Sequence, residues 1–192
     1  MSPVQSASAL AQMKSLKLHV GCANIRLEGY VNIDCRKTEA TDIVAPAWNI
    51  AGVDPASVSF IYSRHMLEHL DPEDARKALK HWLTLLTPGG MLNVIVPDIE
   101  FHAQQLIGLK KSHFPDQVQH AFAAFWGWRD VARGGSREDA HRWGYTQSTL
   151  TDELQNTGFI GIHRLTSGPD TEPWHLNLTA QKHKTDNCGV LG

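Results

Sequence analysis

Apolar and polar positions alternate along residues 16–20 (LKLHV), which predicts a β-strand that runs into the small-residue loop Gly21-Cys22-Ala23-Asn24. A second alternating segment ends at Asp34. In doubly wound sheets, a small-residue loop after the first strand lets the backbone approach a nucleotide, and an acid after the second strand bonds ribose hydroxyls. The interval from Gly21 to Asp34 is shorter than the ~20 residues of a dinucleotide fold, so it leaves little room for a full crossover helix.

Strands and helices continue to alternate after Asp34, and this alternation predicts a parallel α/β sheet. The clearest helix begins at Asp71-Pro72, because aspartate is a favoured N-cap and proline suits the first helical position. The segment Thr87-Pro88-Gly89-Gly90 ends it. A later helix runs from Gln147 to Thr157, with Gly158 as its C-cap. Strands are predicted at residues 41–45, 58–63, 91–96, 159–165 and 176–181.

Residues 99–146 differ from the rest of the chain, because they are rich in aromatic residues and histidine and show weak periodicity. Such an insertion usually caps a site, so we expect a lid there. With 192 residues, the chain can bury one good core. We therefore expect one domain over residues 16–182, preceded by a loose arm over residues 1–15 and followed by a tail over residues 183–192.

Composition narrows the class of partner. The formal net charge of −2 gives no electrostatic footprint for nucleic acid or an anionic membrane, and no apolar run reaches the ~18 residues of a membrane span. We therefore expect a small-molecule partner, no nucleic acid and no membrane, while the oligomeric state stays open. The three cysteines lack CxxC spacing, and residues 1–15 lack the pattern of a signal peptide. Both observations favour a reducing cytoplasm.

Several short motifs fall in a characteristic order along residues 16–182: the GCAN loop, GYVNID at 29–34, HMLEHL at 65–70, LTPGG at 86–90, VPD at 96–98 and Gly158-Phe159. This order resembles class I S-adenosylmethionine-dependent methyltransferases, and within them a small, poorly characterised bacterial group often found with polysaccharide or secondary-metabolite genes. The resemblance implies a Rossmann-like, doubly wound, seven-stranded sheet with one antiparallel strand in three α/β/α layers. It also implies methyl transfer from S-adenosylmethionine to a small-molecule acceptor, a sugar, metabolite or natural-product hydroxyl, with S-adenosylhomocysteine as product.

The same resemblance implies a set of cofactor-binding residues, namely Gly21, Cys22, Ala23, Asp34, Ala47, Trp48, Arg64 and His65. Two positions depart from the family pattern, since Ala23 stands where glycine is usual and Pro46 lies near where an acid usually meets the adenine. We expect Ala23 to keep a negative φ, because Asn24 can take the left-handed position at lower cost. We also expect weaker cofactor binding than usual, or an adenine held by Ala47 and Trp48 through apolar contact.

His65, Glu68 and His69 stand at i, i+3 and i+4, so on a helical turn they would share one face. H-x-x-E-H is the inverted zinc-peptidase signature, which leaves a metal-dependent hydrolase as an alternative function. Some ubiquinone-pathway and small-RNA methyltransferases resemble the segment with E-x-x-E-H and a distal histidine, which bind a divalent ion. The candidate metal ligands are therefore His65, Glu68, His69 and His141, although purely structural roles are favoured.

His141 lies in the segment AHRWGY, which resembles an H-x-x-G-Y segment of the same family. We expect an exposed histidine in a helix-poor lid, suited to substrate binding or proton removal. The catalytic base would be His141, then His65, with Glu68 orienting a partner. Residues 122–128 would wall the acceptor pocket. A cofactor-binding module without turnover remains a third hypothesis, because of the two departures from the family pattern.

Overall fold

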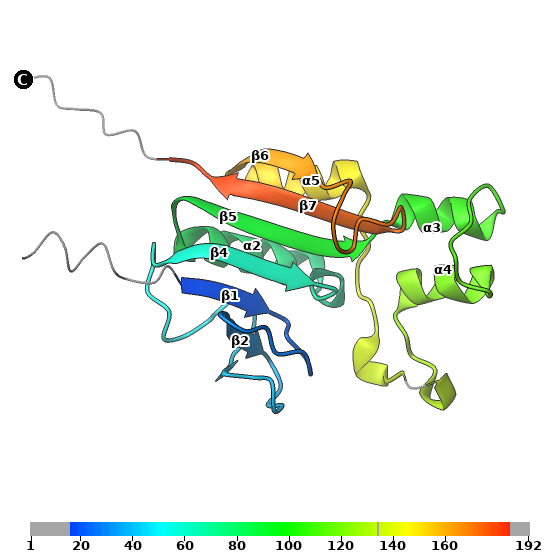
Figure 1. The fold of residues 1–192 in the computed structure, drawn as a ribbon, viewed down its shortest axis with the longest axis horizontal. Coiled ribbons are helices and arrows are strands. Elements are labelled where there is room, and N and C mark those ends of the chain that lie inside the picture. Colours follow the sequence, from blue (N-terminus) through cyan, green and yellow to red (C-terminus); the bar gives the residue numbers. More distant parts are fainter. Residues whose placement is uncertain (1–15, 134, 185–192) are drawn as a thin grey trace, which may run out of the picture.

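Seven strands form one mixed sheet in the computed structural model, which describes residues 16–133 and 135–184 (Figure 1). Their order is β3-β2-β1-β4-β5-β7-β6, and β7 runs antiparallel to both of its neighbours while the other pairs are parallel. The predicted seven-stranded sheet with one antiparallel strand is therefore confirmed. The strands are β1 (Leu16–Val20), β2 (Val31–Asp34), β3 (Ile43–Val44), β4 (Val58–Arg64), β5 (Leu86–Pro97), β6 (Phe159–Arg164) and β7 (His175–Lys182).

The central strands are buried, which explains their apolar sequences. Leu18 and Val20 of β1, Ile61 of β4 and Val94 of β5 are each at most 1% exposed. Parallel strands covered on both faces read as nearly continuous apolar runs. No helix lies between β1 and β4, so the short interval after Gly21 contains a loop, as its length predicts.

Helices α2 (Pro72–Leu85) and α5 (Gln147–Thr157) lie side by side behind the sheet in Figure 1. An ion pair of 3.4 Å joins Arg76 of α2 to Glu153 of α5. The predicted helix starts are correct, and Gly158 takes a φ of 110° as a left-handed C-cap. In the part of the chain that the structure describes, α2 and α5 are the helices that pack on the sheet, and they lie on the same face. The predicted three-layer arrangement needs a second helical layer on the opposite face, and the described residues do not contain it.

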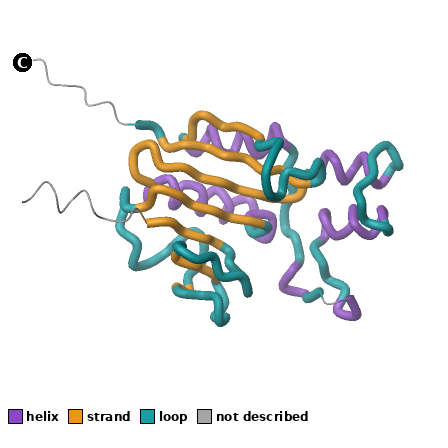
Figure 2. Tube along the Cα trace, in the orientation of Figure 1, coloured by secondary structure: helices purple, strands orange, loops and turns teal. Residues whose placement is uncertain are grey.

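Residues 99–146, which we expected to form a lid, contain two helices, so the expectation that this segment would be helix-poor is wrong. Helices α3 (Ile99–Leu106) and α4 (Gln117–Trp126) project beyond the strand ends as an antiparallel-looking pair (Figures 1 and 2). Asp98 and Asp116 cap them by accepting backbone N–H groups, which is the usual start of a helix. Three short 3₁₀ turns complete the helical content of the described residues: η1 (Leu67–His69), η2 (Val131–Arg133) and η3 (Arg137–Asp139).

Some expectations concern segments outside the described residues. These include the loose arm over residues 1–15 and, except for residues 183 and 184, the C-terminal tail. None of the helices in the described ranges combines the length and hydrophobicity that a membrane crossing requires.

Candidate active site

The loop after β1 turns sharply against the segment after β4. Gly21 has a φ of 81°, and the N–H groups of Gly21 and Cys22 both donate to the carbonyl of Ile33, at 2.8 and 3.0 Å. A Cβ at Gly21 would lie 2.3 Å from Cγ of Met66, closer than any real side-chain contact. Glycine is therefore required here both by the backbone conformation and by the close approach of Met66.

Ala23 adopts a φ of 45°, so the prediction of a negative φ is wrong. Its N–H donates to Oδ2 of Asp34 at 2.8 Å, and its carbonyl accepts from Oγ1 of Thr38 at 2.6 Å. These two bonds hold the backbone on both sides of the residue. Asn24, which was expected to absorb the left-handed conformation, does not have a positive φ.

This strain gives a first prediction. A left-handed alanine costs about 1–2 kcal/mol, and glycine removes this cost. Glycine also gives the unfolded chain more conformational entropy, which offsets part of the gain. Ala23→Gly should therefore stabilise the protein by about 0.5–1 kcal/mol. The affinity for S-adenosylhomocysteine should not change, because Ala23 does not line the cavity described below. Ala51→Gly is the matched control, since Ala51 has no positive φ and should lose stability. Chemical denaturation measures both variants, and a destabilised Ala23→Gly would contradict the strain.

Asp34 ends β2 and is 7% exposed. Its Oδ2 accepts from Ala23, and its Oδ1 accepts from the backbone N–H of Arg36 at 2.9 Å. Each carboxylate oxygen has further lone-pair capacity, so Asp34 can brace the loop and still accept a ligand hydroxyl.

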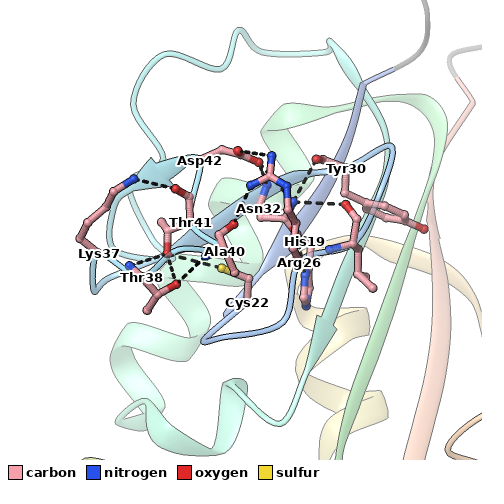
Figure 3. A network of polar contacts seen from close by, with 11 residues as sticks. His19, Cys22, Arg26, Tyr30, Asn32, Lys37, Thr38, Ala40, Thr41 and Asp42 are labelled. Carbon is pink, nitrogen blue, oxygen red and sulfur yellow. Dashed lines mark hydrogen bonds and ion pairs between the residues drawn. The ribbon is translucent and has the colours of Figure 1, made fainter.

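A network of polar side chains from β1, β2 and the segment before β3 supports this loop (Figure 3). Asn32 of β2 bonds His19 at 3.0 Å and the backbone of Leu27 at 2.9 Å, while Asp42 accepts from the backbone N–H of Asn32 and pairs with Arg26 at 2.6 Å. The N–H of Asn32 and the Arg26 guanidinium lower the pKa of Asp42 to about 2. Arg26 is thus occupied in fixing the loop.

Beside this loop, a cavity of about 310 Å³ opens at the carboxyl ends of β1, β2 and β4. Four of the predicted cofactor residues line it: Gly21, Asp34, Ala47 and Trp48. Four others do not, namely Cys22, Ala23, Arg64 and His65. The cavity has further lining residues that no sequence pattern indicated, and these include Cys35, Met66, Leu70, Asp71, Asp74 and Arg142.

Two of the residues outside the cavity have other partners. The thiol of Cys22 is buried against Oγ1 of Thr41 at 3.8 Å, and burial raises its pKa. Arg64 forms two hydrogen bonds with Asp170, at 2.9 and 2.7 Å, and this pairing lowers the pKa of Asp170. Arg64 therefore ties the end of β4 to the loop between β6 and β7.

A second cavity, of about 340 Å³, is lined by six histidines, and we call it the histidine cavity. Burial, followed by neighbouring imidazoles, lowers the pKa of His120 and of His175 to about 4 each. No lysine or arginine is among its described lining residues. His69 lines both cavities. The histidines are His65, His69, His102, His120, His141 and His175, with Trp128 and Trp174 beside them.

Under this cavity, the carboxylate of Glu68 is 1% exposed and faces three imidazoles. Its Oε1 lies 3.1 Å from Nδ1 of His65 and 4.0 Å from Nε2 of His141, while its buried Oε2 has no hydrogen-bond partner among the described residues. Burial alone would raise the pKa of Glu68, but the hydrogen bond from His65 and the nearby imidazoles of His69 and His141 lower it. Glu68 is therefore a buried carboxylate.

Backbone carbonyls fix the tautomers of two of these imidazoles. Nδ1 of His69 lies 3.1 Å from the carbonyl of Ala140, and Nδ1 of His141 lies 2.7 Å from the carbonyl of Ala124. A carbonyl only accepts, so each Nδ1 carries the proton and each Nε2 keeps its lone pair. The side chain of His141 is 9% exposed, so the expectation of an exposed histidine is wrong.

The segment that holds His65, Glu68 and His69 follows β4 directly and forms no full α-helical turn. Only residues 67–69 form a 3₁₀ turn, and His65 precedes it with a φ of 48°. The four candidate metal ligands nevertheless lie close together, and ligand atoms of Glu68, His69 and His141 are all within 4.8 Å of one another. The short 3₁₀ turn does not provide the long helix on which an inverted zinc-peptidase motif depends.

The sheet order, the glycine loop after β1, the acid after β2 and the cavity at the strand ends define the class I methyltransferase fold. A family described as "Methyltransferase domain" matches residues 15–163 of the chain. The protein belongs to this family, and it is a class I S-adenosylmethionine-dependent methyltransferase.

Solved structures support the same fold. A methyltransferase from Methanosarcina mazei is 14% identical, with 96% of this chain and 99% of that chain covered and a TM-score of 0.55. One from Archaeoglobus fulgidus is also 14% identical, with 88% and 86% covered and a TM-score of 0.59. A Burkholderia thailandensis N1-methyltransferase, solved with 1,6-didemethyltoxoflavin and S-adenosylhomocysteine, is 16% identical, with 94% and 78% covered and a TM-score of 0.55. No curated protein matches the chain.

Proposed function

We propose that the protein transfers the methyl group of S-adenosylmethionine to the hydroxyl of an uncharged small molecule held in the histidine cavity. The observation that carries this proposal is the position of His69, which lines both cavities, so that they share a wall. An in-line methyl transfer depends on such proximity, because the sulfonium is already activated. The lack of lysine and arginine among the described lining residues favours an uncharged acceptor over an anion.

For the cofactor, we propose that Asp34 bonds the ribose hydroxyls and that Gly21 lets the backbone lie close to the cofactor. Ala47 and Trp48 would contact the adenine. The other predicted cofactor residues would act from outside the cavity, Cys22 and Ala23 through the loop and Arg64 through Asp170. The free thiols of Cys22 and Cys35 support a reducing, cytoplasmic setting.

For the acceptor, we assign proton removal to His141. As the acceptor oxygen bonds the methyl carbon and the carbon–sulfur bond breaks, the hydroxyl proton would pass to Nε2 of His141, whose Nδ1 is already occupied. Burial lowers the pKa of His141, although Glu68 opposes this, so the imidazole is neutral near pH 7. Glu68 would then stabilise the imidazolium that forms. His65, held by Glu68, is the second candidate for the base.

The same donor set fits a divalent cation. Glu68 offers its unpartnered Oε2, and His69 and His141 offer Nε2 while their Nδ1 atoms bond backbone carbonyls, which is the usual outer arrangement of metal-bound histidine. Such an ion would polarise an acceptor hydroxyl. His65 would then be the base.

The test of this function is transfer of a labelled methyl group from S-adenosylmethionine to matched acceptors. We expect label in uncharged compounds such as glucose or catechol, and little in glucose 6-phosphate or protocatechuate. Binding of S-adenosylhomocysteine without transfer to any acceptor would favour a non-catalytic module. Transfer only to the anions would contradict the role given to the histidine cavity. Parallel assays with EDTA, followed by Mg²⁺ or Zn²⁺, separate proton removal by His141 from activation by a metal.

A further inference from the structure

A groove with several large apolar side chains lies on the outer face of α4, next to the histidine cavity. Four large apolar side chains gather in it and are strongly exposed, since Phe122 and Trp126 are 48% and 60% exposed and Trp128 and Val131 also face solvent. Its volume is about 580 Å³. We call this feature the α4 groove.

The sequence of α4 explains why these side chains point outward. Ala121 and Ala124 are buried, and the small residues let α4 approach α3 closely. Phe122 and Trp126 stand one helical turn apart on the other face, so α4 is apolar on both sides. A surface helix usually keeps its outer face polar, which makes this second apolar face unusual.

Two glycines shape the segment after α4, and one of them, Gly127, lines the α4 groove. A Cβ at Gly127 would lie 1.6 Å from the carbonyl oxygen of Asp139, and a Cβ at Gly135 would lie 2.1 Å from that of Trp128. The chain after α4 therefore folds back tightly on itself, and this places Trp128 between the groove and the histidine cavity.

The groove and the histidine cavity share two lining residues, Ala123 and Trp128. We propose that the α4 groove is the subsite for an extended apolar substituent of the acceptor, whose hydroxyl lies among the histidines. This inference rests on the proposed function, and it narrows the acceptor to amphipathic alcohols or phenols that carry an alkyl, acyl or aryl tail. The two lining residues shared with the histidine cavity favour this occupant over a second copy of the chain.

The charges around the groove favour the same occupant over an anionic lipid surface. Among the described residues Arg129, Asp130 and Arg137 line it, so charges of both signs are present there. Binding to anionic lipid usually depends on clustered Lys and Arg around the apolar face. An uncharged tail needs only the apolar surface.

The experiment is calorimetric titration of phenol, 4-ethylphenol, 4-butylphenol and 4-hexylphenol into the protein saturated with S-adenosylhomocysteine. Each buried methylene is worth about 0.8 kcal/mol, so affinity should rise up to about fourfold per methylene until the groove is filled. Phe122→Ala should weaken 4-hexylphenol at least tenfold and leave phenol unchanged. Val118→Ala is the matched control, because Val118 is on the same helix one turn earlier and exposed but does not line the groove.

Several outcomes would overturn the proposal. These are equal affinity for phenol and 4-hexylphenol, no measurable binding of 4-hexylphenol, or an equal loss in Phe122→Ala and Val118→Ala. A dimer that both variants dissociate in sedimentation would assign the surface to a second copy, and vesicle binding that both variants lose would assign it to lipid. If the unmodified protein binds S-adenosylhomocysteine but affinity does not change with the length of the alkyl chain, only the assignment of the α4 groove is refuted. If the unmodified protein does not bind S-adenosylhomocysteine, the proposed function is refuted instead.

Discussion

Gly21→Ala is expected to weaken S-adenosylhomocysteine binding at least tenfold and to destabilise the protein by at least about 2 kcal/mol. The added Cβ would lie 2.3 Å from Cγ and 2.5 Å from Cβ of Met66, and the φ of 81° would remain. Gly21 and Met66 both line the cofactor cavity, so a shift of either one changes the shape of the site. Calorimetry gives the affinity, and chemical denaturation gives the free energy of unfolding.

Gly29→Ala separates backbone strain from this contact. Gly29 has nearly the same φ, 79°, but a Cβ there would meet nothing within 4 Å. Its substitution should cost about 1–2 kcal/mol of stability and leave the affinity for S-adenosylhomocysteine unchanged. If the two variants lost affinity equally, the contact between Gly21 and Met66 would not shape the cofactor site.

Glu68→Gln should lower the rate of methyl transfer by about 10²-fold or more, which is the lower end of the contribution of acid–base catalysis. Glutamine keeps the shape of the side chain but removes the negative charge that faces His65, His69 and His141. Glu68 lines neither cavity, so S-adenosylhomocysteine should bind as before. The loss should therefore fall on kcat, measured well below the melting temperature because the variant also loses about 1–3 kcal/mol of stability.

Glu153→Gln is the control for charge removal. Glu153 pairs with Arg76 on the surface between α5 and α2, and such pairs contribute at most about 1 kcal/mol. This variant should keep the rate of the unmodified protein. A normal rate in Glu68→Gln would remove the carboxylate from the reaction and leave the cluster around it as a purely structural feature.

Local signals were enough to predict individual strands and the two packed helices, while the seven-stranded sheet with its antiparallel strand was predicted from the family resemblance. Alternation marked β1, the Asp71-Pro72 pair marked the start of α2, and Gly158 marked the end of α5, because each signal acts within a few residues. The lid helices were missed although Asp98 and Asp116 are ordinary N-caps. The apolar residues of α4 lie on two faces, which hides the helical period.

The two cavities show the limit of local reasoning. The loop and acid of the cofactor cavity could be predicted, because Gly21 and Asp34 follow their strands directly. The histidine cavity brings together residues from the segment after β4, from α3, α4 and β7, and no spacing in the sequence encodes that meeting. The left-handed Ala23 was missed for the same reason, since bonds to Asp34 and Thr38 impose its conformation.

The most direct test of the account is calorimetric titration of the unmodified protein with S-adenosylhomocysteine, together with its thermal unfolding. A ligand that binds only the folded state stabilises it by mass action, by about 2.7 kcal/mol at a hundred times its Kd. We predict one bound molecule per chain and a raised melting temperature, with both effects weakened in Gly21→Ala and kept in Gly29→Ala. No heat and no thermal shift at saturating ligand would contradict the assignment of the cavity beside Gly21 and Asp34 to the cofactor.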